Sequence, residues 1–236
     1  MTRFATTSWT LILRAASEDD AEAQLALAVL CEMYWYPIYA YVRRLGASAA
    51  DAEDMTQAYF ARFLEKQVVR SVHPDRGRFR SFLFVSVRNF FNNERDRWRA
   101  SKREGSRRLV SLDVATAEEQ FKAHLHRDAS PETLFVRTWA ETLLERVHRR
   151  LEDEASRRGN RERVRALRAC LPPAEREPDY AAIAKAWGVK PGAVRVALHR
   201  LRGRFGEILR EEVGRTVEAQ ADVEDEGRHL LRALGS

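Results

Sequence analysis

The stretch from Pro178 to Val213 constrains the fold more than any other, because it contains two helical patterns joined by a short break. In the first pattern, apolar residues recur three and four positions apart, which predicts one buried face of a short helix. These residues are Tyr180, Ile183, Ala184 and Trp187. Asp179 stands where a side chain can cap this helix, and Gly188 stands where the chain turns. We therefore expect a short helix followed by a tight turn.

The second pattern is longer and has one apolar and one basic face. Pro191 occupies a first helical position, where the missing N–H is tolerated. The apolar stripe consists of Val194, Leu198, Leu201, Phe205 and Ile208. The opposite face carries Lys190, Arg195, His199, Arg200, Arg202, Arg204 and Arg210. Two interpretations are open: a helix-turn-helix that reads DNA, with cations on phosphates and the first turn near base edges, or an Arg-rich helix in solvent.

Composition places the chain among ordinary globular proteins. Of its 236 residues, 44% are hydrophobic and 32% are charged, which excludes a wholly disordered chain and a membrane protein. No apolar run approaches the roughly 20 residues of a spanning helix. The N-terminal sequence lacks the apolar core and cleavage site of a signal peptide. We expect a cytoplasmic protein without a membrane span.

Residues that could bind a metal or perform catalysis form no known pattern. Cys31 and Cys170 are far apart, and His124 and His126 have no further ligand nearby, so we expect buried thiols, no metal and no other cofactor. The chain also lacks a phosphate-binding loop and the motifs GxGxxG, HExxH and GxSxG. We therefore expect no enzymatic activity.

Charge is unevenly distributed along the chain. The net charge is +6, yet residues 1–60 contain four Arg and eight Asp or Glu. Residues 88–108 contain eight Lys or Arg and three Asp or Glu. This pattern is expected if one face contacts nucleic acid and another contacts a basic partner.

No strand-like alternation and no internal repeat appear, so we expect an all-α protein with two helical domains. The first domain spans residues 1–103, with helices over 8–15, 21–45, 49–66 and 78–103; Pro37 should bend or split the second of these. Residues 104–130 are interpreted as a flexible linker with a possible short helix over 118–126. The second domain spans 131–213, with helices from Pro131 to about Ala155 and around Leu167 before the helix-turn-helix. The acidic tail, 214–236, is either a docking helix or frayed.

The helix over 49–66 has two contrasting faces. Its buried side is expected to contain Met55, Tyr59, Phe60, Phe63 and Leu64. Its first turns carry Asp51, Glu53, Asp54 and Gln57, which should be exposed. Carboxylates near a helix N-terminus are favoured by the helix dipole, but three of them in four positions exceed what capping requires.

The helix over 78–103 begins apolar and ends basic. Amides at Asn89, Asn92 and Asn93 alternate with the rings of Phe90 and Phe91. Rings can stack on unpaired bases, amides can bond base edges and arginines can hold the backbone, which suits single-stranded nucleic acid. A core helix with a solvated basic end explains the composition equally well.

Taken together, these segments resemble the extracytoplasmic-function (ECF) sigma factors, the two-domain branch of bacterial RNA polymerase initiation factors. The resemblance covers residues 20–103 and 131–213. It is carried by the motifs DAEDMTQ at 51–57, FRSFL at 79–83 with Arg88-Asn89 after it, Tyr180 to Gly188, and VRVALHRLR at 194–202. The chain departs from the family at Lys190 and Ala193, where Ser and Thr are usual, and at Phe82, where Trp is usual.

The resemblance implies three contact surfaces. One binds the β′ clamp helices of core RNA polymerase and consists of Asp51, Glu53, Asp54 and Gln57. A second melts and reads the minus-ten promoter element and consists of Phe82, Arg88, Asn89, Asn92, Asn93 and Arg95. The third reads the minus-thirty-five element and consists of Lys190, Ala193, Arg195, His199, Arg200 and Arg202. Further partners implied are the polymerase β flap, promoter DNA and a possible anti-sigma factor or other regulator.

A stand-alone helix-turn-helix regulator is the alternative function. Such a protein binds duplex operators without polymerase, and it leaves the acidic residues 51–57 and the Asn- and Phe-rich helix unexplained. For the tail, we expect Leu230 to Leu234 to pack against a domain or a partner, because an apolar helix end seldom stays solvated.

Overall fold

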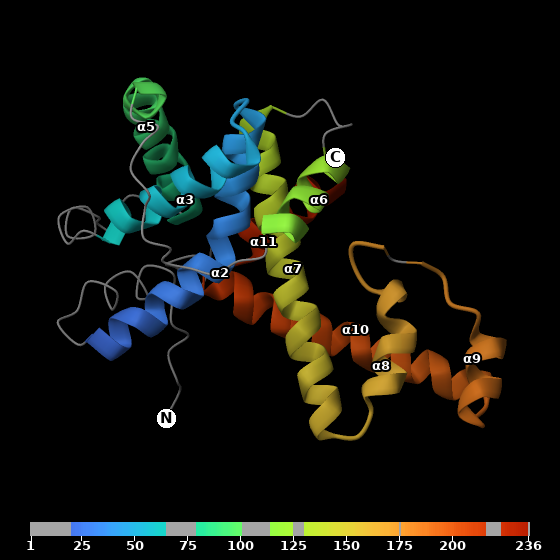
Figure 1. Ribbon diagram of the computed structural model, residues 1–236. Coiled ribbons are helices and arrows are strands. Elements are labelled where there is room, and N and C mark those ends of the chain that lie inside the picture. The colour runs from blue at the N-terminus through green and yellow to red at the C-terminus, as the bar shows by residue number, and fades with distance from the viewer. Residues whose placement is uncertain are drawn as a thin grey trace. The chain divides into compact units, whose positions relative to one another are not determined.

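The computed structural model describes residues 20–64, 79–100, 114–124, 130–174, 176–215 and 223–235 (Figure 1). Every secondary-structure element in these ranges is helical, which confirms the predicted all-α class. None of their helices is long and apolar enough to span a bilayer. The contact pattern divides the chain into two compact units. The first comprises Met1–Trp139 with Gly214–Asp222, and the second comprises Ala140–Val213 with Val223–Ser236.

The first unit is built from α2 (Asp20–Arg44), α3 (Ala49–Leu64), α5 (Phe79–Ala100), α6 (Val114–His124) and the start of α7 (Pro131–Arg157). Helix α2 continues through Pro37 and is not split, although its axis changes direction along its length (Figure 1). It ends at Arg44, and the turn that follows contains Gly46, where φ is 94°. The predicted helix over 8–15, residues 65–66 and residues 101–103 lie outside the described ranges.

Helix α6 belongs to the core of the first unit. It begins four residues before the predicted Glu118, and its Phe121 packs in a buried cluster with Ala40 of α2 and Leu134 of α7. Arg43 of α2 donates two hydrogen bonds to the Glu118 carboxylate, at 2.7 and 2.9 Å. These bonds lower the pKa of Glu118. Residues 114–124 are therefore packed structure, and the possible short helix within the predicted linker is present here as α6.

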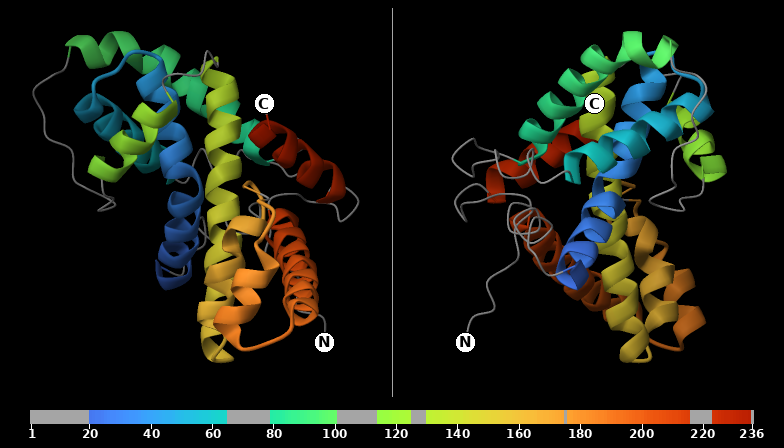
Figure 2. Two further views of the ribbon diagram at one scale, coloured as in Figure 1. Left: turned by 90° about the vertical axis from the view of Figure 1, so that its right-hand side faces the viewer. Right: turned by 60° about the vertical axis from the view of Figure 1, so that its left-hand side comes forward.

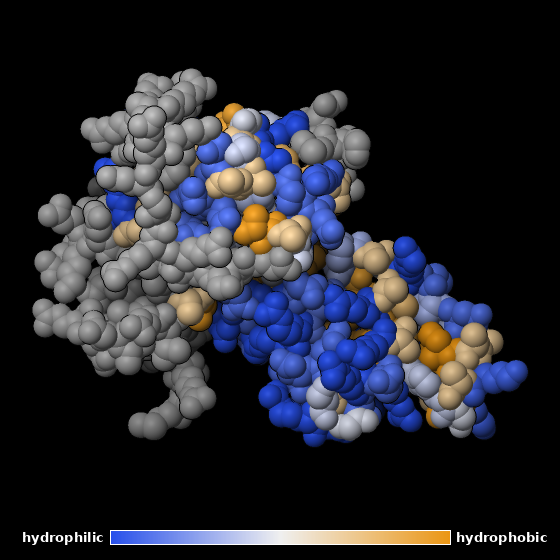
Figure 3. All heavy atoms as spheres, viewed as in Figure 1, coloured by the Kyte–Doolittle hydropathy of each residue, from blue (hydrophilic) through white to orange (hydrophobic). Residues whose placement is uncertain are grey.

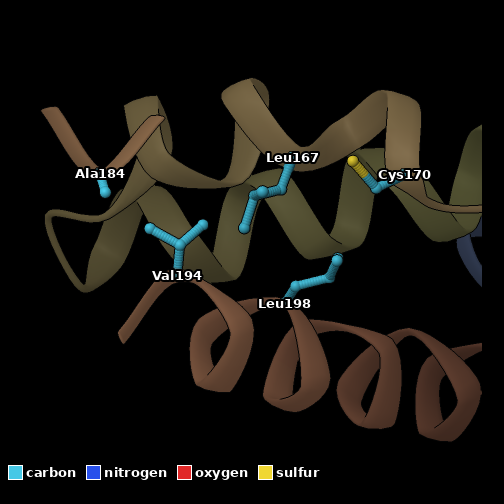
Figure 4. Packing of buried hydrophobic residues seen from close by; sticks show 5 residues of the cluster. All are labelled: Leu167, Cys170, Ala184, Val194 and Leu198. Atoms are coloured by element: carbon cyan, nitrogen blue, oxygen red, sulfur yellow. The ribbon is translucent and has the colours of Figure 1, made fainter. Parts of the chain in front are cut away.

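The second unit contains the rest of α7, then α8 (Arg161–Leu167), the short 3-10 helix η2 (Arg168–Cys170), α9 (Tyr180–Trp187), α10 (Pro191–Gly214) and α11 (Val223–Gly235). Its core cluster joins four of these elements and consists of Leu167, Cys170, Ala184, Val194 and Leu198 (Figure 4). Tyr180, Ile183, Trp187 and Leu201 pack around it. The predicted apolar faces of α9 and α10 are thus confirmed. The thiols of Cys31 and Cys170 are buried, as predicted.

Ion pairs join the C-terminal half of α10 to α7, which lies beside it in both views of Figure 2. Glu212 is 0% exposed and accepts hydrogen bonds from Arg150 at 2.6 Å and Arg146 at 3.4 Å. Arg204 donates two bonds to Glu154, at 2.6 and 2.8 Å. A buried carboxylate without such partners is strongly destabilising, so the bonds from Arg146 and Arg150 stabilise the buried Glu212.

The acidic tail contains helix α11. Val223, Glu226 and Leu230 are buried on one side of it, whereas Leu231 is exposed. This burial favours the packed form of the tail over a frayed end. Residues 216–222 lie outside the described ranges.

The turn before α10 provides a test of backbone geometry. Gly188 has φ of 64°, a left-handed conformation that costs other residues about 1–2 kcal/mol. Gly203 lies within α10, and apart from its chain neighbours and the helix backbone no described atom lies within 4 Å of the position its Cβ would take. We expect Gly188→Ala to lower the free energy of unfolding by about 1 kcal/mol and Gly203→Ala to raise it by about 0.5–1 kcal/mol. Urea unfolding followed by circular dichroism measures both, and equal effects would contradict the assignment of the turn.

Candidate nucleic-acid interface

The first turn of α3 carries the predicted acidic surface. Ser48 caps the helix: its hydroxyl accepts from the Asp51 N–H at 3.1 Å and donates to the Asp51 carboxylate at 2.7 Å. Asp51 and Glu53 are half-exposed and Asp54 is exposed. Asp51 therefore has a capping role, while Glu53 and Asp54 leave carboxylate charge on the surface.

Gln57 is not exposed, so this part of the prediction is wrong. Its side chain is only 4% exposed, because it lies on the edge of the buried face of α3. Its amide nitrogen lies 3.3 Å from a carboxylate oxygen of Glu53 and donates to it. The neighbouring Thr56 is fully buried and donates to the backbone carbonyl of Ala52. A helix turn that is acidic by sequence thus presents carboxylates but not the amide or the hydroxyl.

A groove of about 560 Å³ lies between α3 and α5. Its lining combines aromatic, amide and hydroxyl side chains, with one guanidinium. From α3 come Tyr59, Arg62 and Phe63, and from α5 come Ser81, Phe82, Val85, Ser86, Asn89, Phe90 and Asn93. Three residues of the predicted minus-ten set, Phe82, Asn89 and Asn93, are therefore brought together in one groove.

Aromatic contacts fix the shape of this groove. The Tyr59 ring packs edge-on against Phe90, with centroids 5.5 Å apart, and its hydroxyl donates to Ser86 at 3.0 Å. Burial raises the pKa of Tyr59, so the phenol stays a neutral donor. The Arg62 guanidinium lies 5.8 Å from the centre of the Phe90 ring. The groove thus has a firm aromatic wall beside a cation.

The remaining residues of that set lie elsewhere on α5. Arg88 and Asn92 are exposed but do not line the groove, and the side chain of Arg95 lies outside the described residues. Sequence reasoning missed Arg62 and Val85, which do line it. The spacing of 82, 85, 86, 89 and 93 follows one face of a helix, and this signal could have identified Val85.

In the second unit, α9, a three-residue break and α10 follow the predicted pattern. The Asp179 carboxylate accepts from the N–H groups of Ala181 and Ala182 at 3.1 and 3.0 Å, which confirms the predicted cap. The Ala193 N–H donates to the carbonyl of Lys190 at 2.9 Å. The backbone therefore satisfies a donor in the first turn of α10 without a Ser or Thr side chain.

The cations of α10 fall into two groups. Lys190, Arg195, His199, Arg200 and Arg202 are exposed, as is Ala193. Arg195 lies 5.0 Å from the centre of the Tyr180 ring, and Arg202 donates to the Cys170 carbonyl at 3.3 Å. Arg204 is instead held by Glu154 and Glu207, which raise its pKa, so its inclusion in the open basic face is wrong.

Two further arginines extend the basic surface. Arg158 and Arg163 line a cavity of about 390 Å³ together with Arg200 and the Glu154–Arg204 pair. Arg163 lies 5.4 Å from the centre of the Trp187 ring. In Figure 3, hydrophilic residues cover most of the visible face of the second unit, with a smaller hydrophobic area at the end that holds α9. The sequence analysis did not identify these two arginines, although the Arg-rich run from 157 to 168 could have indicated them.

The two groups of cations predict different behaviour for two arginines one turn apart. We expect Arg204→Gln to lower the stability of the protein, because Glu154 loses its partner, and to leave the salt dependence of duplex binding unchanged. We expect Arg200→Gln to leave stability unchanged and to reduce the slope of log K against log salt by about one. Thermal unfolding and salt titrations of binding measure the two effects. Equal salt slopes for both variants would contradict this division.

Comparison with known proteins gives one match. Residues 31–104 match the family model described as Sigma-70 region 2. This segment contains α3, α5 and the groove between them. No curated protein and no solved structure matches the chain. This part of the chain is therefore similar to Sigma-70 region 2.

Proposed function

We propose that this protein is a sigma factor of the ECF type, which directs core RNA polymerase to specific promoters and has no catalytic chemistry of its own. The observation that carries the proposal is the α3–α5 groove, because it lies within the segment that matches Sigma-70 region 2 and presents Phe82, Asn89 and Asn93 together. The first unit binds polymerase and the minus-ten element, and the second unit binds the minus-thirty-five element. A cytoplasmic location, a β flap contact and an anti-sigma partner remain predictions of this assignment.

Polymerase binding is assigned to the first turns of α3. Glu53 and Asp54 supply carboxylates at the surface, and Asp51 adds charge while capping the helix. Such a cluster attracts a basic partner over a Debye length of about 8–10 Å at ordinary salt. Gln57 acts on this surface indirectly, through its hydrogen bond to Glu53.

Reading of the minus-ten element is assigned to the groove. An unpaired base can stack on the half-exposed Phe82 ring, and the exposed amides of Asn89 and Asn93 offer both donors and acceptors to base edges. Arg62 supplies positive charge at the same groove. This combination favours single-stranded over duplex DNA, because a paired base has its edges occupied and its faces stacked.

Reading of the minus-thirty-five element is assigned to the end of the turn and the N-terminal half of α10. Lys190, Arg195 and Arg200 are exposed there and can neutralise phosphates or bond base edges in the major groove. The match to region 2 favours this sigma factor assignment over a stand-alone regulator, since a regulator needs no single-strand groove. Gel shifts separate the two functions: a sigma factor binds promoter DNA tightly only with core polymerase, whereas tight specific binding by the free protein would favour the regulator.

Charge reversal on α3 tests the polymerase surface. We expect Asp54→Lys to weaken binding to core polymerase at least tenfold without changing thermal stability. The exposed carboxylate is replaced by a positive charge, which repels the basic surface of the partner. Glu119→Lys is the matched control, since Glu119 is an exposed acid of the same unit on α6. Size-exclusion chromatography and titration with core polymerase provide the measurement. Equal loss of binding in both variants would indicate only a general charge effect.

Two asparagines one turn apart on α5 test the groove. We expect Asn89→Ala to weaken holoenzyme binding to a DNA fork with a single-stranded minus-ten segment by about tenfold, the loss of a base-edge contact of 1–3 kcal/mol. Asn92→Ala serves as the control, because Asn92 is exposed but does not line the groove. Fluorescence anisotropy of a labelled fork measures both affinities. A larger effect at Asn92 than at Asn89 would place the base elsewhere.

A further inference from the structure

Val196 is the most exposed large apolar residue of α10, and none of the contacts described above explains it. Its relative exposure is 51%. β-branched residues lose side-chain freedom in helices, so an exposed helix position is less favourable for valine than for alanine. A single exposed valine is ordinary on a protein surface, and its meaning depends on where it points.

Helix geometry places Val196 on the line farthest from the core. Successive residues are rotated by about 100°, so Val196 lies about 200° around the helix from the buried Val194. Gly192 and Gly203 lie on nearly the same outward line and have no side chains. A surface that approaches this side of α10 therefore has direct access to the methyl groups of Val196.

The surroundings of Val196 favour an anionic partner. Residues 190–203 include Lys190, Arg195, Arg200 and Arg202 and contain no Asp or Glu. All four cations are exposed. An apolar protein partner would have to cover these charges, whereas duplex DNA offers phosphates on both sides of a major groove whose floor carries one apolar group, the thymine 5-methyl.

We propose that Val196 is a specificity-determining residue that contacts the 5-methyl group of a thymine in the upstream promoter element. The inference rests on the proposed function, because it requires α10 to enter the major groove. Arg195 and Arg200 position the helix on the backbone and neighbouring base edges. Val196 selects an A·T pair at the base pair beneath it, since only thymine places a methyl group there.

The test begins with the full-length protein bound to core RNA polymerase and a library of random duplex DNA. Repeated selection yields an upstream motif. Each thymine of that motif is then replaced singly by deoxyuridine, which removes the methyl group and keeps the base pairing. Affinities are measured for the wild-type holoenzyme and for Val196→Ala.

At one thymine we expect uracil to weaken wild-type binding about fourfold, the factor for losing one buried methyl group. Val196→Ala should weaken binding to the thymine duplex by a similar factor and make the protein insensitive to uracil at that position only. Val189→Ala, a matched change at an exposed valine in the turn before α10, should keep the full uracil effect. Wild-type stability of the Val196→Ala protein, checked by thermal unfolding, excludes loss of folding.

The outcomes separate this inference from the function on which it rests. An enriched motif in which no thymine shows a uracil effect that depends on Val196 would overturn the role of Val196 and leave the sigma factor assignment in place. A motif without thymine would have the same consequence. Failure to enrich any upstream motif, with core polymerase bound, would overturn the proposed function together with the inference.

Discussion

The ion pairs between α7 and α10 determine what the second unit can present. Glu212 is completely buried, and the bonds from Arg150 and Arg146 stabilise its carboxylate there. About two turns before Glu212, Arg204 donates a hydrogen bond to Glu154. The C-terminal half of α10 is therefore committed to the fold, and its Arg204 neutralises carboxylates of the same unit. The N-terminal half keeps its cations at the surface, where an anionic ligand can reach them.

In the first unit, an aromatic framework shapes the surface. Tyr59 contacts Phe90 and Ser86 at once, so the spacing of α3 and α5 depends on one buried ring. The groove lies directly over this contact and gathers the amides and the half-exposed ring of Phe82. The acidic turn of α3 begins two turns earlier on the same helix. The surfaces proposed for a basic partner and for an unpaired base thus lie at opposite ends of a single helix.

Much of this arrangement could be predicted from the sequence, where periodicity and caps are strong. The helix from Pro131, the Asp179 cap and the Gly188 turn are local features, and local rules predict them. Two features depended on contacts across the chain and could not be predicted in this way. Helix α6 has few buried residues, and its position depends on Arg43 and Phe121 meeting distant partners. Likewise, Gln57 is buried by neighbouring helices, although its own sequence neighbourhood is acidic.

The same limitation applies to the basic face of α10. A helical wheel shows which residues share a side, but it does not show that Glu154 reaches Arg204 from fifty positions earlier. It also gives no reason to prefer Arg158 and Arg163, which come from other elements, as neighbours of Arg200. Charge patterns along one segment predict the sign of a surface. The pairing of charges between segments determines how much of that charge remains accessible to a ligand.

Through the Glu154–Arg204 pair, a residue of α7 determines how much positive charge α10 presents at its surface. As long as Glu154 is present, the charge of the Arg204 guanidinium is neutralised within the fold. A relative with a neutral residue at position 154 would release that charge toward the exposed half of α10 without any change in the recognition helix itself. Affinity for DNA and its salt dependence could then diverge between relatives that have identical recognition helices. Comparisons of promoter preference within such a group would need to include the residues that neutralise arginines as well as those that contact bases.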